Sequence, residues 1–136
     1  MDFARAVHAP SRRSGRLRIM TGSGRLLDLD ALLESVGGDC ELLDELAATF
    51  ISEVPSWVTS LRAALASHDS ATVFRVAHGV TGAVGYFRAP RVRQLAADLE
   101  ALGRAGHLDG AATLLDRLET ALLDLGRFLR EPPWRH

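Results

Sequence analysis

The sequence predicts an all-α fold, an antiparallel up-and-down four-helix bundle preceded by a short capping helix. Three observations lead to this prediction. Apolar residues recur every three or four positions from Leu26 almost to the end of the 136-residue chain. Short polar or glycine-rich turns divide this pattern into one short and four long segments. No alternating pattern typical of a β-strand is visible.

The short helix and the first long helix meet at a pair of glycines. Four apolar residues fall on one face of a helix over residues 28–36, and the glycines at 37–38 end it. Asp39 is then well suited to cap a helix over residues 39–66. Pro55 lies inside that helix and should bend it locally, because the apolar pattern continues in phase beyond it.

Three further long helices follow, separated by short turns. They are expected over residues 70–87, 91–104 and 109–129. Asp69 or Ser70 would cap the first of them, and Pro90 suits the first turn of the second. Asp109 would cap the third, after a turn over residues 103–106.

A basic segment precedes the predicted bundle. Residues 1–25 carry six arginines against one carboxylate, so the overall net charge of −1 hides an acidic remainder. We interpret residues 1–25 as a flexible arm, residues 26–130 as the bundle and residues 131–136 as a tail. The arm could be solvated or could contact nucleic acid or an acidic partner. The acidic bundle argues against nucleic-acid binding, and we expect none.

The composition and motifs exclude several classes of protein. Cys40 is the only cysteine, so an internal disulfide or a multi-thiolate metal site cannot form. No residues stand at metal-ligand spacing, and no nucleophile–base pair or phosphate loop is visible. No apolar run reaches the roughly 18 residues of a membrane helix, and a secretory signal is missing. We therefore expect a cytoplasmic protein with no metal, no enzymatic activity and no membrane contact.

The candidate chemistry lies on the helix over residues 70–87. At 100° per residue, its apolar side chains fall within about 60° of one direction, which defines the core face. That face comprises Val73, Val76, Ala77, Val80, Val84 and Phe87. His78 falls about 140° from the reference direction, on the solvent side, near Gly82 at about 180° and Gly85 at about 120°.

Three glycines in this helix need an explanation. Each helix-interior glycine costs about 1 kcal/mol relative to alanine, and Gly79, Gly82 and Gly85 all lie inside the predicted helix. One interpretation is that they let another helix pack closely. The other is that they clear space for a partner to reach the imidazole of His78. Gly82 favours the second, because it lies opposite the apolar stripe.

The stretch AHGVTGAVGYF at residues 77–87 resembles the signature of histidine-phosphotransfer (HPt) domains, in which Ala-His is followed by an apolar residue, Lys and Gly. Two other segments agree with this resemblance. Residues 37–43 together with Phe50 are similar to the opening of the family's first long helix. The segment LAADLE at residues 95–100 is similar to its following helix, and the resemblance spans residues 28–129.

The resemblance implies a phosphocarrier of a multistep phosphorelay without catalytic activity of its own. His78 would take a phosphoryl group from the aspartyl phosphate of a response-regulator receiver domain, or return one to a receiver. Neutral imidazole is a competent nucleophile near pH 7. The partners implied are receiver domains, a hybrid histidine kinase or both. The receiver would supply Mg²⁺, so we expect no cofactor in this chain, and we expect a monomer.

Two positions depart from the family pattern. Thr81 stands where family members usually carry Lys, three residues after the histidine, and it offers a hydroxyl but no charge. Arg88 stands where a glycine usually follows the aromatic pair. Arg75, one turn before His78, is either an ordinary solvated arginine or a cation that partly replaces the missing Lys.

Phe74, a neighbour of His78 on the same predicted helix, has two interpretations. Phe74 is either half-buried core or, with Gly82 and Gly85, part of a face that docks a receiver.

The leading functional hypothesis is an active phosphorelay intermediate. The alternative is an HPt-like interaction module that binds a receiver or kinase without carrying phosphate, and its support is Thr81.

Overall fold

The computed structural model describes residues 18–21 and 24–131, and this part of the chain is mostly helical, as predicted. Two short strands precede the helices. The elements are β1 (Arg18–Thr21), β2 (Gly24–Asp28), α2 (Leu29–Ser35), α3 (Cys40–Ala66), α4 (Ser70–Gly85), α5 (Pro90–Ala105) and α6 (Ala111–Arg130).

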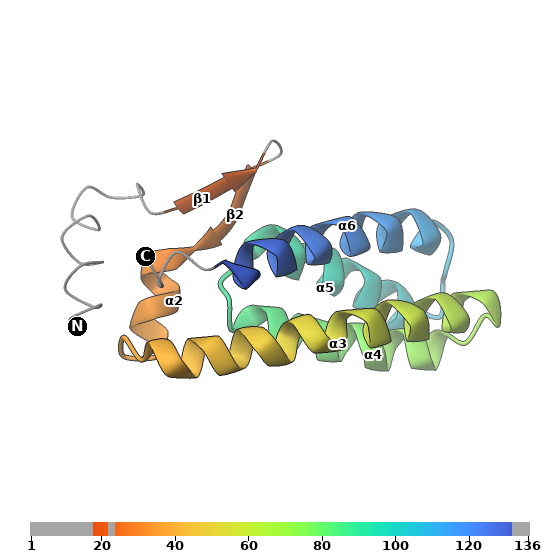
Figure 1. The fold of residues 1–136 in the computed structure, drawn as a ribbon. Helices are drawn as coiled ribbons and strands as arrows, with labels where there is room; N and C mark the ends of the chain where they lie inside the picture. The colour runs from red at the N-terminus through yellow and green to blue at the C-terminus, as the bar shows by residue number, and fades with distance from the viewer. Residues whose placement is uncertain (1–17, 22–23, 132–136) are drawn as a thin grey trace.

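The four long helices lie side by side, and the chain reverses direction at each turn between them (Figure 1). Helix α4 packs against α3 and α5, and α6 packs against the same two helices. The α4–α5 pair therefore lies on the opposite side of the bundle from the α3–α6 pair. Helix α2 lies at the end of the bundle where α3 begins (Figure 1).

Local signals set the first helix boundaries as predicted. Gly37 and Gly38 end α2 with φ angles of +64° and +79°, a conformation that glycine adopts at little cost. The side chain of Asp39 then accepts a hydrogen bond from the backbone N–H of Leu42, which caps α3. Helix α3 continues through Pro55 without interruption.

The later boundaries agree in part with the prediction. Asp69 caps α4 by accepting from the N–H of Thr72, and Pro90 is the first residue of α5. The expectation that Asp109 caps α6 is wrong. The capping residue is Gly110, with φ +79° and no side-chain hydrogen bond.

Two helix ends also differ from their predicted positions. Helix α4 ends at Gly85 instead of residue 87, because the chain turns there to bring Phe87 into the core. Helix α5 continues to Ala105, and Gly106 ends it in the left-handed conformation with φ +72°.

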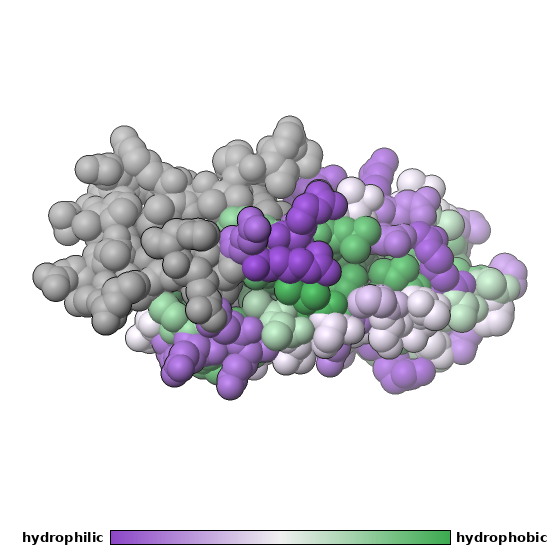
Figure 2. Space-filling model, viewed as in Figure 1, coloured by the Kyte–Doolittle hydropathy of each residue, from purple (hydrophilic) through white to green (hydrophobic). Residues whose placement is uncertain are grey.

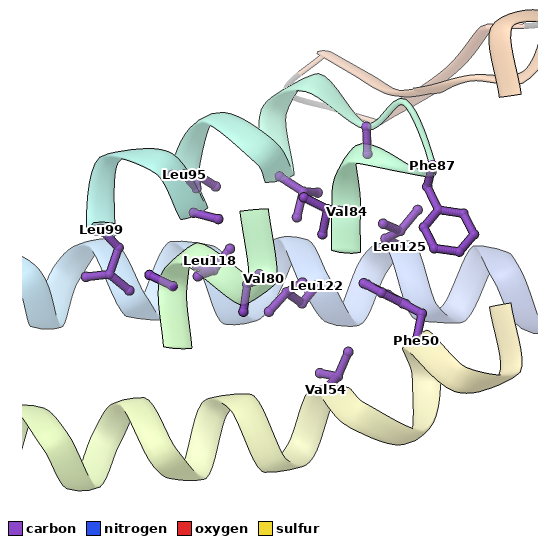
Figure 3. Packing of buried hydrophobic residues seen from close by; sticks show 14 of the residues in the cluster. Phe50, Val54, Val80, Val84, Phe87, Leu95, Leu99, Leu118, Leu122 and Leu125 are labelled. Carbon is purple, nitrogen blue, oxygen red and sulfur yellow. The ribbon is translucent and has the colours of Figure 1, made fainter. Parts of the chain in front are cut away.

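The buried residues form one core that the five helices of the described residues share. On α4 the buried side chains are Val73, Ala77, Val80 and Val84, which confirms the predicted core face, with Val76 partly buried. Phe50 of α3 packs edge-on against the ring of Phe87, with 5.3 Å between centroids. Figure 3 shows these two rings at one end of the packed leucines and valines of α4, α5 and α6.

Close approach between two helices occurs at Gly103. A Cβ atom on Gly103 of α5 would lie 2.5 Å from the backbone nitrogen of Phe74 of α4, so only glycine fits. In contrast, a Cβ on Gly79, Gly82 or Gly85 would have no atom within 4 Å. The interpretation that these three glycines admit a packed helix is therefore wrong.

The expectation that the chain contains no strand is also wrong. Strands β1 and β2 pair antiparallel, with Arg18 opposite Asp28 and Thr21 opposite Gly24. The described part of the predicted arm, residues 18–21 and 24–25, belongs to this hairpin, and the rest of residues 1–25 lies outside the described residues. The hairpin contacts α5 through β2 and α2 through β1.

The face formed by α3 and α6 carries hydrophobic residues in its middle, between the two helices, with hydrophilic residues around them (Figure 2). Across these helices the guanidinium of Arg62 pairs with Asp116, 3.0 Å away, and with Glu119. Of the helices in the described residues, none is long and apolar enough to cross a membrane.

Candidate functional site

His78 lies on the exposed side of α4, as predicted. Its side chain is 70% exposed, although its neighbour Ala77 is fully buried. The reason is the helical step, which turns the residue after a core position toward solvent. Gly79 and Gly82 are exposed and leave the surface beside the imidazole without side chains.

One ring nitrogen of His78 is held by a carboxylate on the neighbouring helix. The Nδ1 atom lies 3.1 Å from Oε2 of Glu100 on α5. An ionised carboxylate can only accept, so Nδ1 must carry the proton and donate it to Glu100. The neutral ring then has its lone pair on Nε2. Within the described residues, Nε2 has no hydrogen-bond partner.

Glu100 is the buried charged residue of the described core, with 8% of its surface exposed. Burial acts to raise the pKa of Glu100, but the hydrogen bond from His78 and the positive charge of Arg104 outweigh it. The pKa therefore lies below the usual value for a glutamate. Glu100 is thus a stable anion that can hold the proton on Nδ1 in place.

Arg104 and Phe74 complete the surroundings of this pair. Nη2 of Arg104 lies 2.9 Å from the same Oε2 atom of Glu100, one helical turn away on α5. The guanidinium lies over the ring of Phe74, 5.2 Å from its centroid. Phe74 is half-buried and also stacks on the imidazole of His78, with 5.8 Å between centroids. Phe74 is therefore half-buried beside the imidazole, and its part in docking a receiver stays a prediction.

Two other candidate residues, Thr81 and Arg75, donate hydrogen bonds to other residues of α4. The hydroxyl of Thr81 donates to the carbonyl of Ala77 over 2.9 Å. It also contributes to the low pKa of Glu100. Because its single proton is committed to Ala77, we assign the main effect on Glu100 to its hydrogen bond with His78 and to the positive charge of Arg104. The guanidinium of Arg75 donates to the hydroxyl of Thr72 over 3.3 Å, toward the start of α4. The structure therefore does not bring Arg75 to His78.

An open groove lies beside α4, beginning one helical turn beyond His78 at Gly82. Its lining includes Gly82 and Gly85 of α4, Leu42 of α3 and Tyr86. Leu42 and Tyr86 are 38% and 60% exposed, which is high for large hydrophobic side chains. The groove encloses about 620 Å³. Exposed apolar surface of this kind is typical of an interaction site.

Sequence reasoning found the histidine but missed Glu100, which contacts it, and Arg104, which contacts Glu100. Glu100 and Arg104 stand four residues apart, a spacing at which opposite charges interact on a helix. Glu100 also lies directly after the buried Leu99, at the edge of the apolar stripe of α5. These signals mark Glu100 as a paired, partly covered carboxylate, but nothing in the sequence connects it to His78.

The model of the Hpt domain family matches residues 45–128. A similar solved structure is histidine-containing phosphotransfer protein B (HptB) from Pseudomonas aeruginosa PAO1. It is 25% identical, with a TM-score of 0.72, and the match covers 81% of this chain and 96% of that one.

A second similar structure is the HPT domain from the Hpt sensor hybrid histidine kinase of Shewanella. It is 23% identical, with a TM-score of 0.68, and the match covers 77% of this chain and 91% of that one. At this identity the likeness shows the fold alone. No curated protein is significantly similar in sequence.

Proposed function

The chain belongs to the Hpt domain family, and we propose that it is a histidine-phosphotransfer protein of a multistep phosphorelay, with His78 as the phosphorylated residue. The observation that carries the proposal is the state of the imidazole. Its side chain is 70% exposed, Nδ1 is held by Glu100 and Nε2 is free of partners among the described residues. A nucleophilic nitrogen is thereby presented on an open surface.

The transfer step follows from this tautomer. The lone pair of Nε2 attacks the phosphorus of an aspartyl phosphate on a receiver domain. The bond from phosphorus to the aspartate oxygen breaks, and its electron pair returns to the aspartate carboxylate. The proton on Nδ1 stays where it is, so the ring becomes an imidazolium that the carboxylate of Glu100 stabilises. The reverse step returns the phosphoryl group to a receiver aspartate.

The bundle contributes position in this proposal, and the partner contributes the remaining chemistry. Phosphoryl transfer depends on alignment and charge stabilisation more than on covalent help from the protein. We therefore assign Mg²⁺ to the receiver and give this chain no cofactor and no catalytic activity of its own. The protein would act as a cytoplasmic monomer with receiver domains or a hybrid histidine kinase as partners.

The architecture that we propose for this role is an antiparallel up-and-down bundle of α3 to α6 with α2 as its cap. Three leucines of α2 are buried in the common core, which supports this role for the short helix. The groove beside Gly82 then lies on the accessible side of α4, one helical turn from the nucleophile. A receiver could cover both at once.

The experiment is to mix the protein with purified receiver domains that carry ³²P on their aspartate. Label should move to the wild type and should not move to His78→Gln. His107→Gln is the matched control, because His107 is 69% exposed and also has a carboxylate partner, Asp109, 3.4 Å from its Nε2. Transfer to His78→Gln at the wild-type rate would refute the assignment of His78.

The same experiment separates the alternative function. If receivers bind the wild type in titration calorimetry but no label reaches it, the chain is an interaction module that does not carry phosphate. Thr81 supports that alternative, because its hydroxyl cannot neutralise an added phosphoryl charge. The free lone pair on Nε2 supports phosphotransfer, because a binding module would not need it.

A further inference from the structure

The imidazole of His78 and three other side chains form a closed ring of contacts. Oε2 of Glu100 lies 3.1 Å from Nδ1 of His78 and 2.9 Å from Nη2 of Arg104. The guanidinium of Arg104 lies 5.2 Å from the centroid of the Phe74 ring. That ring stacks on the imidazole, with 22° between the two planes. Arg104 is therefore held beside His78 by two partners, a carboxylate and an aromatic face.

Phosphorylation would change the charge balance in this ring. A phosphoryl group adds about −2 of charge, and on Nε2 it would stand across the imidazole from the anionic Glu100. Two anions so close together repel each other, and solvent weakens this repulsion only in part because Glu100 is buried. A cation that can contact both anions would lower the free energy of the phosphorylated state.

We propose, on the basis of the function proposed above, that Arg104 binds the phosphoryl group carried by His78. Its side chain is 65% exposed, so the guanidinium can turn while its stem stays on α5. Arginine has five N–H donors, and the hydrogen bond to Glu100 engages Nη2. The remaining donors form a planar fork that matches phosphate oxygens. One guanidinium can thus bridge Glu100 and the phosphoryl group.

The other polar groups near His78 are less suited to this role. The guanidinium of Arg75 donates a hydrogen bond to Thr72 at the start of α4. It also interacts electrostatically with the carboxylate of Asp69. Thr81 carries no charge and donates to the carbonyl of Ala77. Within the described residues, Arg104 is the arginine that shares a carboxylate oxygen with His78.

The test uses phosphoramidate, a small donor that needs no receiver. Its P–N bond breaks with release of ammonia as the bond from Nε2 to phosphorus forms. The ³¹P NMR signal of the phosphorylated protein is then followed as a function of pH. A nearby guanidinium favours the dianionic phosphoryl group, so Arg104→Gln should raise the pKa of that group by up to about 0.7 unit, the size of an exposed ion pair.

Two further variants make the test specific. Arg75→Gln removes an equal charge from the same surface and should leave the phosphoryl pKa unchanged. Thr81→Lys, added to Arg104→Gln, places a new cation one turn from His78 and should bring the pKa back toward the wild-type value. In the unphosphorylated protein, Arg104→Gln should leave the ¹⁵N shifts of His78 unchanged, because Glu100 sets the tautomer.

The outcomes separate this inference from the proposed function. A phosphoryl pKa that does not change in Arg104→Gln, or that changes equally in Arg75→Gln, overturns the role of Arg104 and leaves phosphorylation of His78 intact. Altered ¹⁵N shifts in Arg104→Gln also overturn it, because the arginine would then act through Glu100. If neither phosphoramidate nor any receiver phosphorylates His78, the proposed function fails and this inference fails with it.

Discussion

Nδ1 of His78 on α4 lies 3.1 Å from Oε2 of Glu100 on α5, across a sequence separation of 22 residues. This contact decides which ring nitrogen is available for chemistry. A carboxylate cannot donate, so it fixes the proton on Nδ1 and leaves the lone pair on Nε2. The bundle thus presents a defined tautomer of an exposed histidine.

Removing the carboxylate of Glu100 should allow His78 to adopt both neutral tautomers. In Glu100→Ala we expect both neutral tautomers of His78 in ¹⁵N NMR spectra, and transfer from a phosphorylated receiver slower by about tenfold, the effect of losing one charge-assisted hydrogen bond. Glu100→Gln keeps an acceptor oxygen and should lose less. A single tautomer with unchanged transfer in Glu100→Ala would show that Glu100 does not orient the ring.

Acid should remove part of the stability that Glu100 provides. Its pKa is lower in the folded protein than in the unfolded chain, so its contribution is present above about pH 4.5 and is lost as the pH falls through the folded-state value. The difference in the free energy of unfolding between wild type and Glu100→Gln should therefore shrink between pH 6 and pH 3, as measured by urea unfolding.

Glu45→Gln is the control for this measurement. Glu45 is an exposed glutamate on α3 that has no hydrogen-bond partner among the described residues. Its substitution should change stability by a similar small amount at both pH values. A pH-independent difference for Glu100→Gln would contradict the electrostatic role assigned to that residue.

A bulky side chain at Gly82 should block the partner and leave the fold intact. A Cβ at Gly82 would have no atom within 4 Å, so Gly82→Leu should be as stable as wild type or slightly more stable. Transfer from a receiver should slow by about tenfold, because the side chain would stand in the docking surface at a cost of about 1–3 kcal/mol. Phosphorylation by phosphoramidate should keep its rate. Equal transfer from the receiver would place docking elsewhere.

Replacing Arg88, the residue after Tyr86 and Phe87, by glycine should increase the stability of the fold. Arg88 has a φ of +51°, in the left-handed region that costs a non-glycine residue about 1 kcal/mol. Arg88→Gly should therefore raise the urea midpoint, by an amount that corresponds to about 1 kcal/mol. His68, with φ +56°, offers a second test of the same strain. A lower midpoint in Arg88→Gly would show that the arginine side chain stabilises the turn by other contacts.

Sequence reasoning predicted the features that depend on neighbouring residues. Asp39 caps α3 and Pro90 begins α5 because both act within one helical turn. His78 is exposed because the apolar period of α4 fixes its direction. Asp109 was the wrong cap, since Gly110 takes a left-handed conformation that starts α6 one residue later. Competing local signals of this kind cannot be ranked from sequence.

The partners of His78 depend on packing between helices, which the sequence does not give. Glu100 reaches the histidine because Gly103 lets α5 approach the backbone of α4 at Phe74. The hairpin was missed for a different reason. Its strands have only 4 and 5 residues, and the mix of Arg, Ser, Gly and Pro10 over residues 1–25, with little periodicity, suggested a flexible arm.

The most direct test of the account is the position of the phosphate after transfer from a receiver. Mass spectrometry under non-acidic conditions identifies the residue, and ³¹P–¹⁵N NMR identifies the nitrogen. The account predicts phosphate on Nε2 of His78, with the proton retained on Nδ1 beside Glu100. Phosphate on Nδ1 of His78, or on another histidine such as His107, would contradict it.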